Sequence, residues 1–123
     1  MTAFLWVLLG GALGSGLRFS LSRLFPFNAA ESFPWSTFFV NLMGCLLIGI
    51  LVGLIDRRPA ETEVIKWFWI SGFCGGFTTF SAFSMETISL VQHDRWPVAI
   101  GYTVSSVLLG IFVTWGGWQW IRS

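Results

Sequence analysis

Residues 69–86 read Trp69-Ile-Ser-Gly-Phe-Cys-Gly-Gly-Phe-Thr-Thr-Phe-Ser-Ala-Phe-Ser-Met-Glu86, an apolar run with a Gly-Gly pair and two adjacent threonines at its centre. Such a run is typical of a membrane helix, where free backbone groups are tolerated only if protein, water or an ion meets them. Gly-Gly followed by Thr-Thr favours an interruption of that helix. Its first half would end near Gly75 with carbonyl groups suited to a cation, and its second would begin near Thr79 with N–H groups suited to an anion. A glycine hinge that only packs closely is the other interpretation.

The rest of the chain is equally apolar. It is 54% hydrophobic and 11% charged, with a mean hydropathy of +0.73, whereas about a quarter of the residues in a soluble domain are charged. The net charge of +1 provides neither a basic patch for nucleic acid nor a polybasic tail for anionic lipid. The composition therefore predicts an all-α integral membrane protein whose surroundings are the lipid bilayer, with no nucleic-acid partner.

Four segments are long enough to cross a membrane, which takes about twenty mainly apolar residues. They are residues 3–24, 35–55, 64–91 and 96–121. Pro, Asn and charged residues punctuate the connections between them, and no stretch is long enough for a linker or an extramembrane domain. We therefore expect residues 1–123 to form a single transmembrane domain of four helices, the third interrupted in mid-membrane, with both termini on one side.

Positive charge hardly distinguishes the two sides of the predicted bundle. The terminus side holds Arg57, Arg58, Lys66 and Arg122, and the opposite side holds Arg18, Arg23 and Arg95. Because an excess of Lys and Arg in short loops sets orientation, four against three is almost no bias. The chain can therefore insert both ways and pair as an antiparallel dimer, or it can have one orientation that is weakly specified.

Small residues recur four apart in every predicted span, a spacing that lets helix backbones approach closely in lipid. The pairs are Gly10 and Gly14, Gly49 and Gly53, Gly72 and Gly76, and Ser106 and Gly110. They predict a packed bundle and say nothing further about activity.

The cysteines and the single histidine do not indicate a metal or redox centre. Cys45 and Cys74 lie in apolar segments without the close Cys/His spacing of a metal site, so we expect both to be core residues. His93 lies in a loop beside Asp94, which leaves no paired axial ligands for haem.

Several polar and aromatic residues gather around the expected interruption. Phe80 and Phe83 are three apart, and two rings presented edge-on can help to hold a small anion, although such spacing is more often plain core. Asn41 is the only amide of an apolar span, and its NH2 group can donate twice. Tyr102 and Ser106, four apart, can extend a line of hydroxyl groups. Two charged residues bound this line, Glu86 and Arg18, and we expect both near the ends of their spans.

Three motifs carry a resemblance to a known family. They are Gly10-Gly-x-x-Gly14-x-x-x-Arg18, Val40-Asn41-x-x-Gly44 and Gly72-x-x-Gly75-Gly76-x-Thr78-Thr79-Phe80-Ser81-x-Phe83. Over essentially its full length the chain resembles the small fluoride-channel family of microbial membranes known as Fluc or CrcB. The third motif is highly specific for that family. One position departs from it, because Ala82 stands where the family often has threonine, which removes a hydroxyl group from the expected pore wall.

The resemblance implies a multi-pass protein of the inner cell membrane that passes fluoride selectively and passively outward and so gives fluoride resistance. It implies an antiparallel, dual-topology homodimer with two pores. The fluoride pathway would comprise Asn41, Phe80, Phe83, Ser81, Tyr102 and Ser106, and we add Thr79 for its expected free N–H group. The backbone carbonyls of Gly75 and Thr78 would hold a structural sodium ion on the dimer axis.

Other classes of membrane protein fit the sequence less well. A small multidrug exporter needs a membrane-embedded carboxylate for proton coupling; the first two spans have none, and Glu86 is the only carboxylate within a span core. A structural scaffold gives no reason for the cluster of Gly-Gly, Thr-Thr and Phe-x-x-Phe. The spans offer no pair of base and nucleophile, so the sequence does not predict an enzyme.

Overall fold

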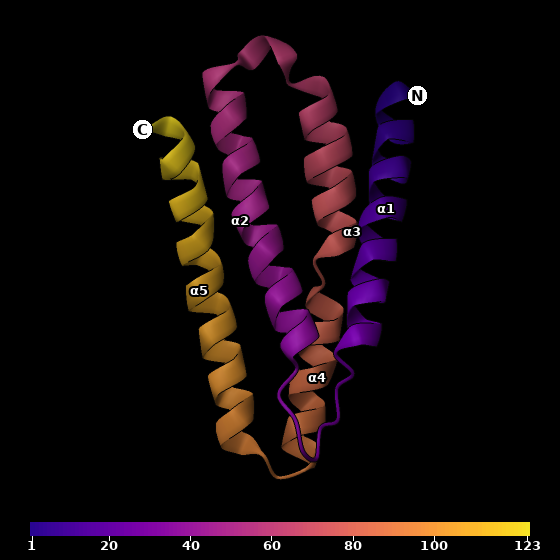
Figure 1. Cartoon of the computed structure of the whole chain (residues 1–123), viewed down its shortest axis with the longest axis vertical. Coiled ribbons are helices and arrows are strands. Elements are labelled where there is room, and N and C mark those ends of the chain that lie inside the picture. The colour runs from indigo at the N-terminus through magenta and orange to yellow at the C-terminus, as the bar shows by residue number, and fades with distance from the viewer.

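The computed structural model describes residues 1–123, apart from the side chain of Glu61. Three helices are long and apolar enough to cross a membrane: α1 (Thr2–Leu24), α2 (Trp35–Arg57) and α5 (Trp96–Arg122). Their ends lie within two residues of the predicted limits. Both chain termini lie at the same end of the molecule, together with the connection that follows α2 (Figure 1).

The third apolar segment consists of shorter helices placed end to end. A 3-10 turn, η1 (Pro59–Glu61), leads to η2 (Ile65–Cys74), α3 (Gly75–Phe77) and α4 (Phe80–Gln92). Thr78 and Thr79 are extended, with ψ angles of 156° and 117°. The helix η2 is a π-helix. This form is rare in proteins, and where it does occur it is often part of a functional site. Nothing in the sequence pattern predicted it.

Proline marks the boundaries of the long helices. Helix α1 ends at Leu24, because Phe25 precedes Pro26 and a residue before proline disfavours the helical conformation. Helix α2 begins directly after Pro34. Helix α5 carries Pro97 in its first turn, where the N–H group that proline lacks has no partner in any helix. These signals explain why the predicted and observed limits agree.

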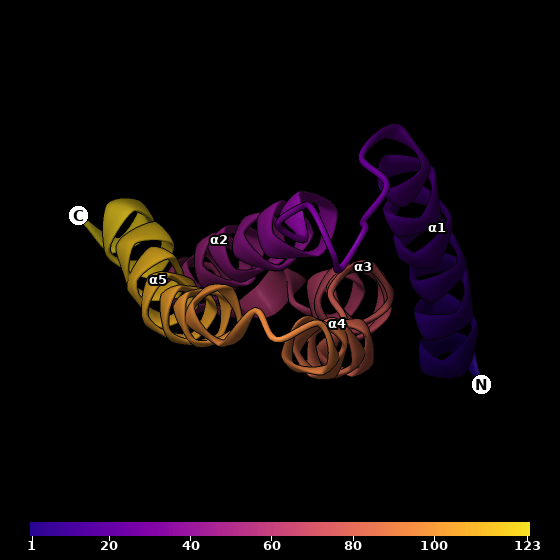
Figure 2. The ribbon, with the colours of Figure 1, turned by 90° about the horizontal axis from the view of Figure 1, so that it is seen from below.

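The helices form two closely packed pairs. Helix α1 packs against η2 and α3, and α2 packs against α5. Seen from below, α1 and α5 lie at opposite flanks, with α2 and α4 between them (Figure 2). Two small buried clusters lie inside: Val40, Leu51, Phe73, Cys74 and Phe77 in one, and Phe38, Leu90, Ala99 and Tyr102 in the other.

Glycine permits the closest of these approaches, as its spacing predicted. A Cβ atom on Gly10 or Gly14 would overlap the carbonyl groups of η2, those of Phe68 and Phe73 respectively. A Cβ atom on Gly76 would lie 2.5 Å from the carbonyl oxygen of Gly11. Backbone therefore lies against backbone along the contact between α1 and η2, and a side chain in that contact would force the helices apart.

Gly14→Ala is accordingly expected to lower the free energy of unfolding by about 1–3 kcal/mol, the usual cost of overpacking a well-packed interior. Gly16→Ala is the matched control, because nothing lies within 4 Å of the Cβ position at Gly16 on the same helix. Thermal unfolding of the two variants in one detergent measures the difference. Equal melting temperatures would contradict this account of the α1–η2 contact.

Candidate functional site

Asn41 holds the extended residues between α3 and α4. Its Nδ2 donates to the carbonyl oxygen of Thr79 at 3.1 Å, and the backbone N–H of Thr79 donates to Asn41 Oδ1 at 2.8 Å. The amide thereby satisfies both backbone groups of a residue that no helix satisfies. The second hydrogen of its NH2 group is left for another acceptor. The sequence indicated a side chain that can donate twice, but it did not identify Thr79 as its partner.

Thr79 is also the N-cap of α4. Its hydroxyl oxygen accepts a hydrogen bond from the N–H of Ala82 at 3.2 Å and lies 3.2 Å from the hydroxyl oxygen of Ser81. A threonine in this position satisfies one of the free N–H groups at a helix start. The hydroxyl groups of Thr79 and Ser81 are therefore linked to each other.

The carbonyl groups of Gly75 and Thr78 have no protein partner in the described part of the chain. The neighbouring carbonyls do have one: that of Cys74 accepts from both the N–H and the hydroxyl group of Thr78, at 3.0 and 2.8 Å. No hydrogen bond reaches the oxygen of Gly75 or Thr78. Unpaired carbonyls at the end of a half-helix are suitable ligands for a small hard cation, and they fit the predicted sodium site.

Arg18 lies six residues before the end of α1, but its guanidinium group does not lie at the end of the span. Its Nε donates to the carbonyl oxygen of Gly76 at 3.0 Å, beside the extended residues, and Ser15 Oγ donates to the same oxygen at 3.4 Å. The expectation failed because a long side chain can reach a backbone carbonyl on a neighbouring helix, here α3. The C-terminal end of a helix carries partial negative charge, which favours a guanidinium there. Because its charge is used inside the protein, Arg18 is a poor guide to the orientation of the chain in the membrane.

An open cavity of about 420 Å³ brings most of the predicted site together. Seven of the nine predicted residues line it: Asn41, Gly75, Thr78, Thr79, Phe80, Phe83 and Ser106. Ser81 and Tyr102 are not among its lining residues. The remainder of the lining is apolar and includes Cys45 and Cys74. Among the described side chains, none that lines this cavity is charged.

The two phenylalanines differ in their surroundings. Phe80 is 78% exposed, whereas Phe83 is half-buried and lies against Tyr102, with ring centroids 5.0 Å apart. The two phenylalanine rings are themselves tilted by 42° at 5.6 Å. An aromatic ring this exposed contributes little to the packing of its own chain. The Phe80 ring is therefore free to contact another molecule or a ligand in the cavity.

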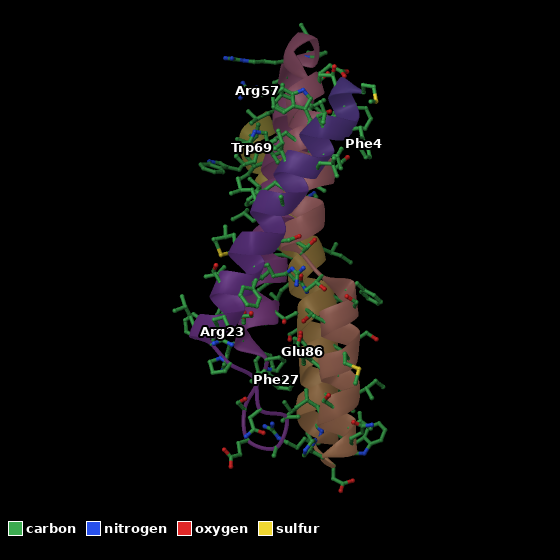
Figure 3. The ribbon with its side chains drawn as sticks, turned by 90° about the vertical axis from the view of Figure 1, so that its right-hand side faces the viewer. Phe4, Arg23, Phe27, Arg57, Trp69 and Glu86 are labelled. Atoms are coloured by element: carbon green, nitrogen blue, oxygen red, sulfur yellow. The ribbon has the colours of Figure 1, made fainter. Side chains whose placement is uncertain are left out.

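Three polar side-chain atoms are buried without a hydrogen-bond partner among the described residues: Glu86 Oε1, Tyr102 Oη and Ser106 Oγ. Glu86 lies on α4, six residues before the end of that helix at Gln92 (Figure 3). The side chain of Thr37, which the residue pattern did not single out, lies near both Glu86 and Tyr102, but its geometry makes no hydrogen bond to Glu86 Oε1 or Tyr102 Oη. A buried polar group without a partner is costly. Tyr102 and Ser106, one turn apart on α5, therefore keep hydroxyl groups that a hydrogen-bond acceptor could satisfy.

The chain is similar to known proteins over almost its whole length. Residues 5–118 match the model of a family described as CrcB-like protein, Camphor Resistance (CrcB). A Flavobacterium psychrophilum protein named fluoride-specific ion channel FluC is 42% identical over 117 residues, which cover 95% of this chain and 94% of that protein. A protein of the same name from Helicobacter acinonychis is 41% identical, with 94% and 91% covered. The chain belongs to the CrcB family.

Proposed function

We propose that this protein is a fluoride-selective channel that lets fluoride leave the cell passively and so protects against it. Fluoride enters cells as its neutral weak acid and dissociates in the more alkaline cytoplasm. An inside-negative potential drives an anion outward, with about 2.3 kcal/mol per charge for each 100 mV. A channel in the inner cell membrane can therefore lower the fluoride concentration of the cytoplasm without a coupled energy source. The names of the relatives support fluoride as the ion.

The observation that carries the proposal is the pair of unpartnered hydroxyl groups on Tyr102 and Ser106, of which Ser106 lines the cavity. Fluoride is small and strongly hydrated, so a pore must replace its water with hydrogen-bond donors. Tyr102 and Ser106 each have a hydroxyl group with no protein acceptor, and Asn41 retains one N–H. Phe80 and Phe83 offer ring edges that attract an anion without a fixed charge that would trap it. Neutral donors in a narrow passage favour entry and release alike.

We propose further that two copies pair in antiparallel orientation, each contributing to two pores. Phe80 and Gly75 are exposed in the single chain at the edge of the cavity, where a second copy would cover them. The carbonyls of Gly75 and Thr78 from both copies would supply four oxygens for one sodium ion on the axis. When bound, the ion supplies positive charge beside a pore wall that has none. The chain would act as one channel domain over residues 1–123.

Fluoride efflux from liposomes that contain the purified protein tests this function, with a fluoride electrode as the readout and chloride-loaded liposomes as the comparison. We expect rapid fluoride release and little chloride release. Equal passage of both anions would overturn the proposal. An imposed proton gradient adds a second test, because Glu86 carries a partly buried carboxylate and a proton-coupled exporter needs a carboxylate within the membrane. Flux that requires the gradient would favour the exporter.

Tyr102→Phe and Ser106→Ala are expected to slow fluoride flux without lowering stability. Each removes a hydroxyl group that has no partner in the described chain, so folding loses no hydrogen bond. The flux loses one donor, worth about 1 kcal/mol or roughly fivefold. Ser105→Ala is the matched control, because its hydroxyl group already donates to the carbonyl of Gly101 at 2.5 Å. Flux and melting temperature measured together separate a conducting role from a packing role.

Dual topology predicts that one loop is reached from both faces of the membrane. Ala60→Cys places a thiol on the exposed connection after α2, in a background in which both native cysteines are alanine. Labelling of intact membranes by an impermeant maleimide is expected from either face. Ala30→Cys, in the exposed loop between α1 and α2, is the companion position at the other end. A strict division, with each position reached from one face only, would show a single orientation.

A further inference from the structure

We propose that Cys45 and Cys74 form a binding site for a soft divalent cation, such as Hg²⁺, and that its occupation blocks the cavity. Both thiols are free, and they are the only cysteines of the chain. They come from different helices, α2 and η2, and line the same 420 Å³ cavity. The expected block of fluoride passage rests on the proposed function, whereas the binding of the cation to the two thiols is independent of it.

A chain of contacts places the two cysteines in one neighbourhood. The side chain of Thr78 donates its hydroxyl group to the carbonyl of Cys74 at 2.8 Å. Its methyl group lies so close to α2 that a Cβ atom on Gly44, the residue before Cys45, would overlap it. Cys74 also packs in the buried cluster that includes Val40 and Leu51 of α2. Helices α2 and η2 therefore approach each other where both carry a thiol.

The two thiols differ in freedom, which suits a bridging ligand. Cys74 is 4% exposed, a nearly fixed group in the wall. Cys45 is half-buried, and its sulfur lies 3.4 Å from the Cβ position of Gly110 on α5. With only a glycine there, no side chain of α5 at that position holds the Cys45 thiol in one rotamer, and Cys45 itself lines the cavity. A small cation bound first to one thiolate can then be captured by the other.

The chemistry selects the ligand. Thiolates prefer soft metals, and Hg²⁺ favours two sulfur ligands in a line. Two S–Hg bonds form, two S–H bonds break, and two protons leave to the solution without oxidation or reduction. The resulting bridge is neutral overall, because two thiolate charges balance the divalent ion. A neutral complex suits an apolar membrane interior, where an uncompensated charge is costly. This argument favours Hg²⁺ over Ag⁺, which would leave a net charge.

A metal ion bound to the two thiols would occupy the part of the cavity that the proposed fluoride pathway uses. Asn41, Phe80 and Phe83 line the same space. A bridged metal ion would fill part of that space and tie α2 to η2. It would also restrain Thr78, one turn beyond Cys74. We therefore expect a bound ion to stop passage without any contact to charged residues.

Mercury retention in the presence of excess glutathione tests the site directly. Purified wild-type protein is treated with HgCl2, washed with glutathione, and examined for bound metal and free thiols. We expect one mercury ion per chain and no free thiol. Cys45→Ala and Cys74→Ala, each with a single ligand, are expected to retain mercury at least tenfold more weakly, about 1.4 kcal/mol. The variant with both cysteines replaced gives the background. Equal retention by wild type and either single variant would overturn the bridge.

Fluoride flux provides the second readout, with each protein compared with its own untreated rate. Mercury should suppress flux in the wild-type protein but not in the variant without cysteines, and dithiothreitol should restore it. Bridged mercury without any loss of flux would overturn the block. If untreated wild-type protein passes no fluoride, the proposed function fails, and the retention measurement still decides the metal site.

Discussion

Phe80→Ile and Phe83→Ile are each expected to reduce fluoride flux at least tenfold, the effect of a barrier raised by about 1.4 kcal/mol. Both substitutions keep an apolar side chain of similar scale, and such exchanges usually cost less than about 1.5 kcal/mol of stability. What they remove is the ring edge, with its positive electrostatic character. Phe80 has little packing to lose, since it is 78% exposed. The folded protein should therefore persist while conduction fails.

Phe112→Ile is the control for this prediction. Phe112 is 63% exposed on α5 and does not line the cavity, so the same exchange there should leave flux unchanged. Efflux from liposomes and elution on size exclusion are measured for all three variants. Normal flux through a well-folded Phe80 or Phe83 variant would return that ring to a packing role. A loss of flux in all three variants would show that any exchange of phenylalanine for isoleucine impairs the protein in lipid, whether or not the residue lines the cavity.

Gly75→Leu is expected to abolish both dimer formation and flux, the second large effect. Nothing in the single chain lies within 4 Å of the Cβ position at Gly75, so the protomer should tolerate the side chain. In the proposed dimer the same position faces the axis and the sodium ion. A bulky group there would keep the second copy away and displace the four carbonyl oxygens. Replacement of sodium in the buffer by a large organic cation should weaken the dimer of the wild-type protein in the same way.

Two other glycines separate the possible causes. Gly116 has an equally open Cβ position on α5, and Gly116→Leu should leave the dimer and the flux intact. Gly76→Ala should instead destabilise the protomer, because its Cβ position lies 2.5 Å from the carbonyl oxygen of Gly11. Cross-linking in membranes reports the dimer, and thermal unfolding reports the protomer. A Gly75→Leu protein that still dimerises and conducts in sodium would overturn the axial site.

Several features of the fold could be predicted because they depend on neighbours in sequence. The limits of α1, α2 and α5 follow from about twenty apolar residues and from the prolines beside them. The family could be recognised from the motif 72–83, which comparison with known proteins then confirmed. Glycine spacing predicted that the helices pack closely, and Gly10 and Gly14 do lie against η2. None of these inferences needs the angle at which one helix meets another.

Predictions about long polar side chains were less successful. The apolar pattern puts Arg18 and Glu86 near the ends of their spans, and each does lie six residues before the end of its helix. The side chain of Arg18 instead reaches the carbonyl of Gly76, and Glu86 keeps one buried carboxylate oxygen without a partner among the described residues. Residue counting gives the depth of a Cα atom, but a long side chain ends elsewhere, and its partner decides where. The pairing of a guanidinium with a free carbonyl is a tertiary contact.

The sequence by itself determined that the chain is an all-helical membrane protein of the CrcB family, because apolar length and local motifs act within a single segment. Only the tertiary structure decided which polar groups remain free. Asn41 could have used both sides of its amide on an ion, but it holds the backbone of Thr79, whereas the hydroxyl groups of Tyr102 and Ser106 have no such partner among the described residues. That difference depends on how each helix is rotated about its axis when it packs, since rotation determines which side chains face each other across helices far apart in the chain.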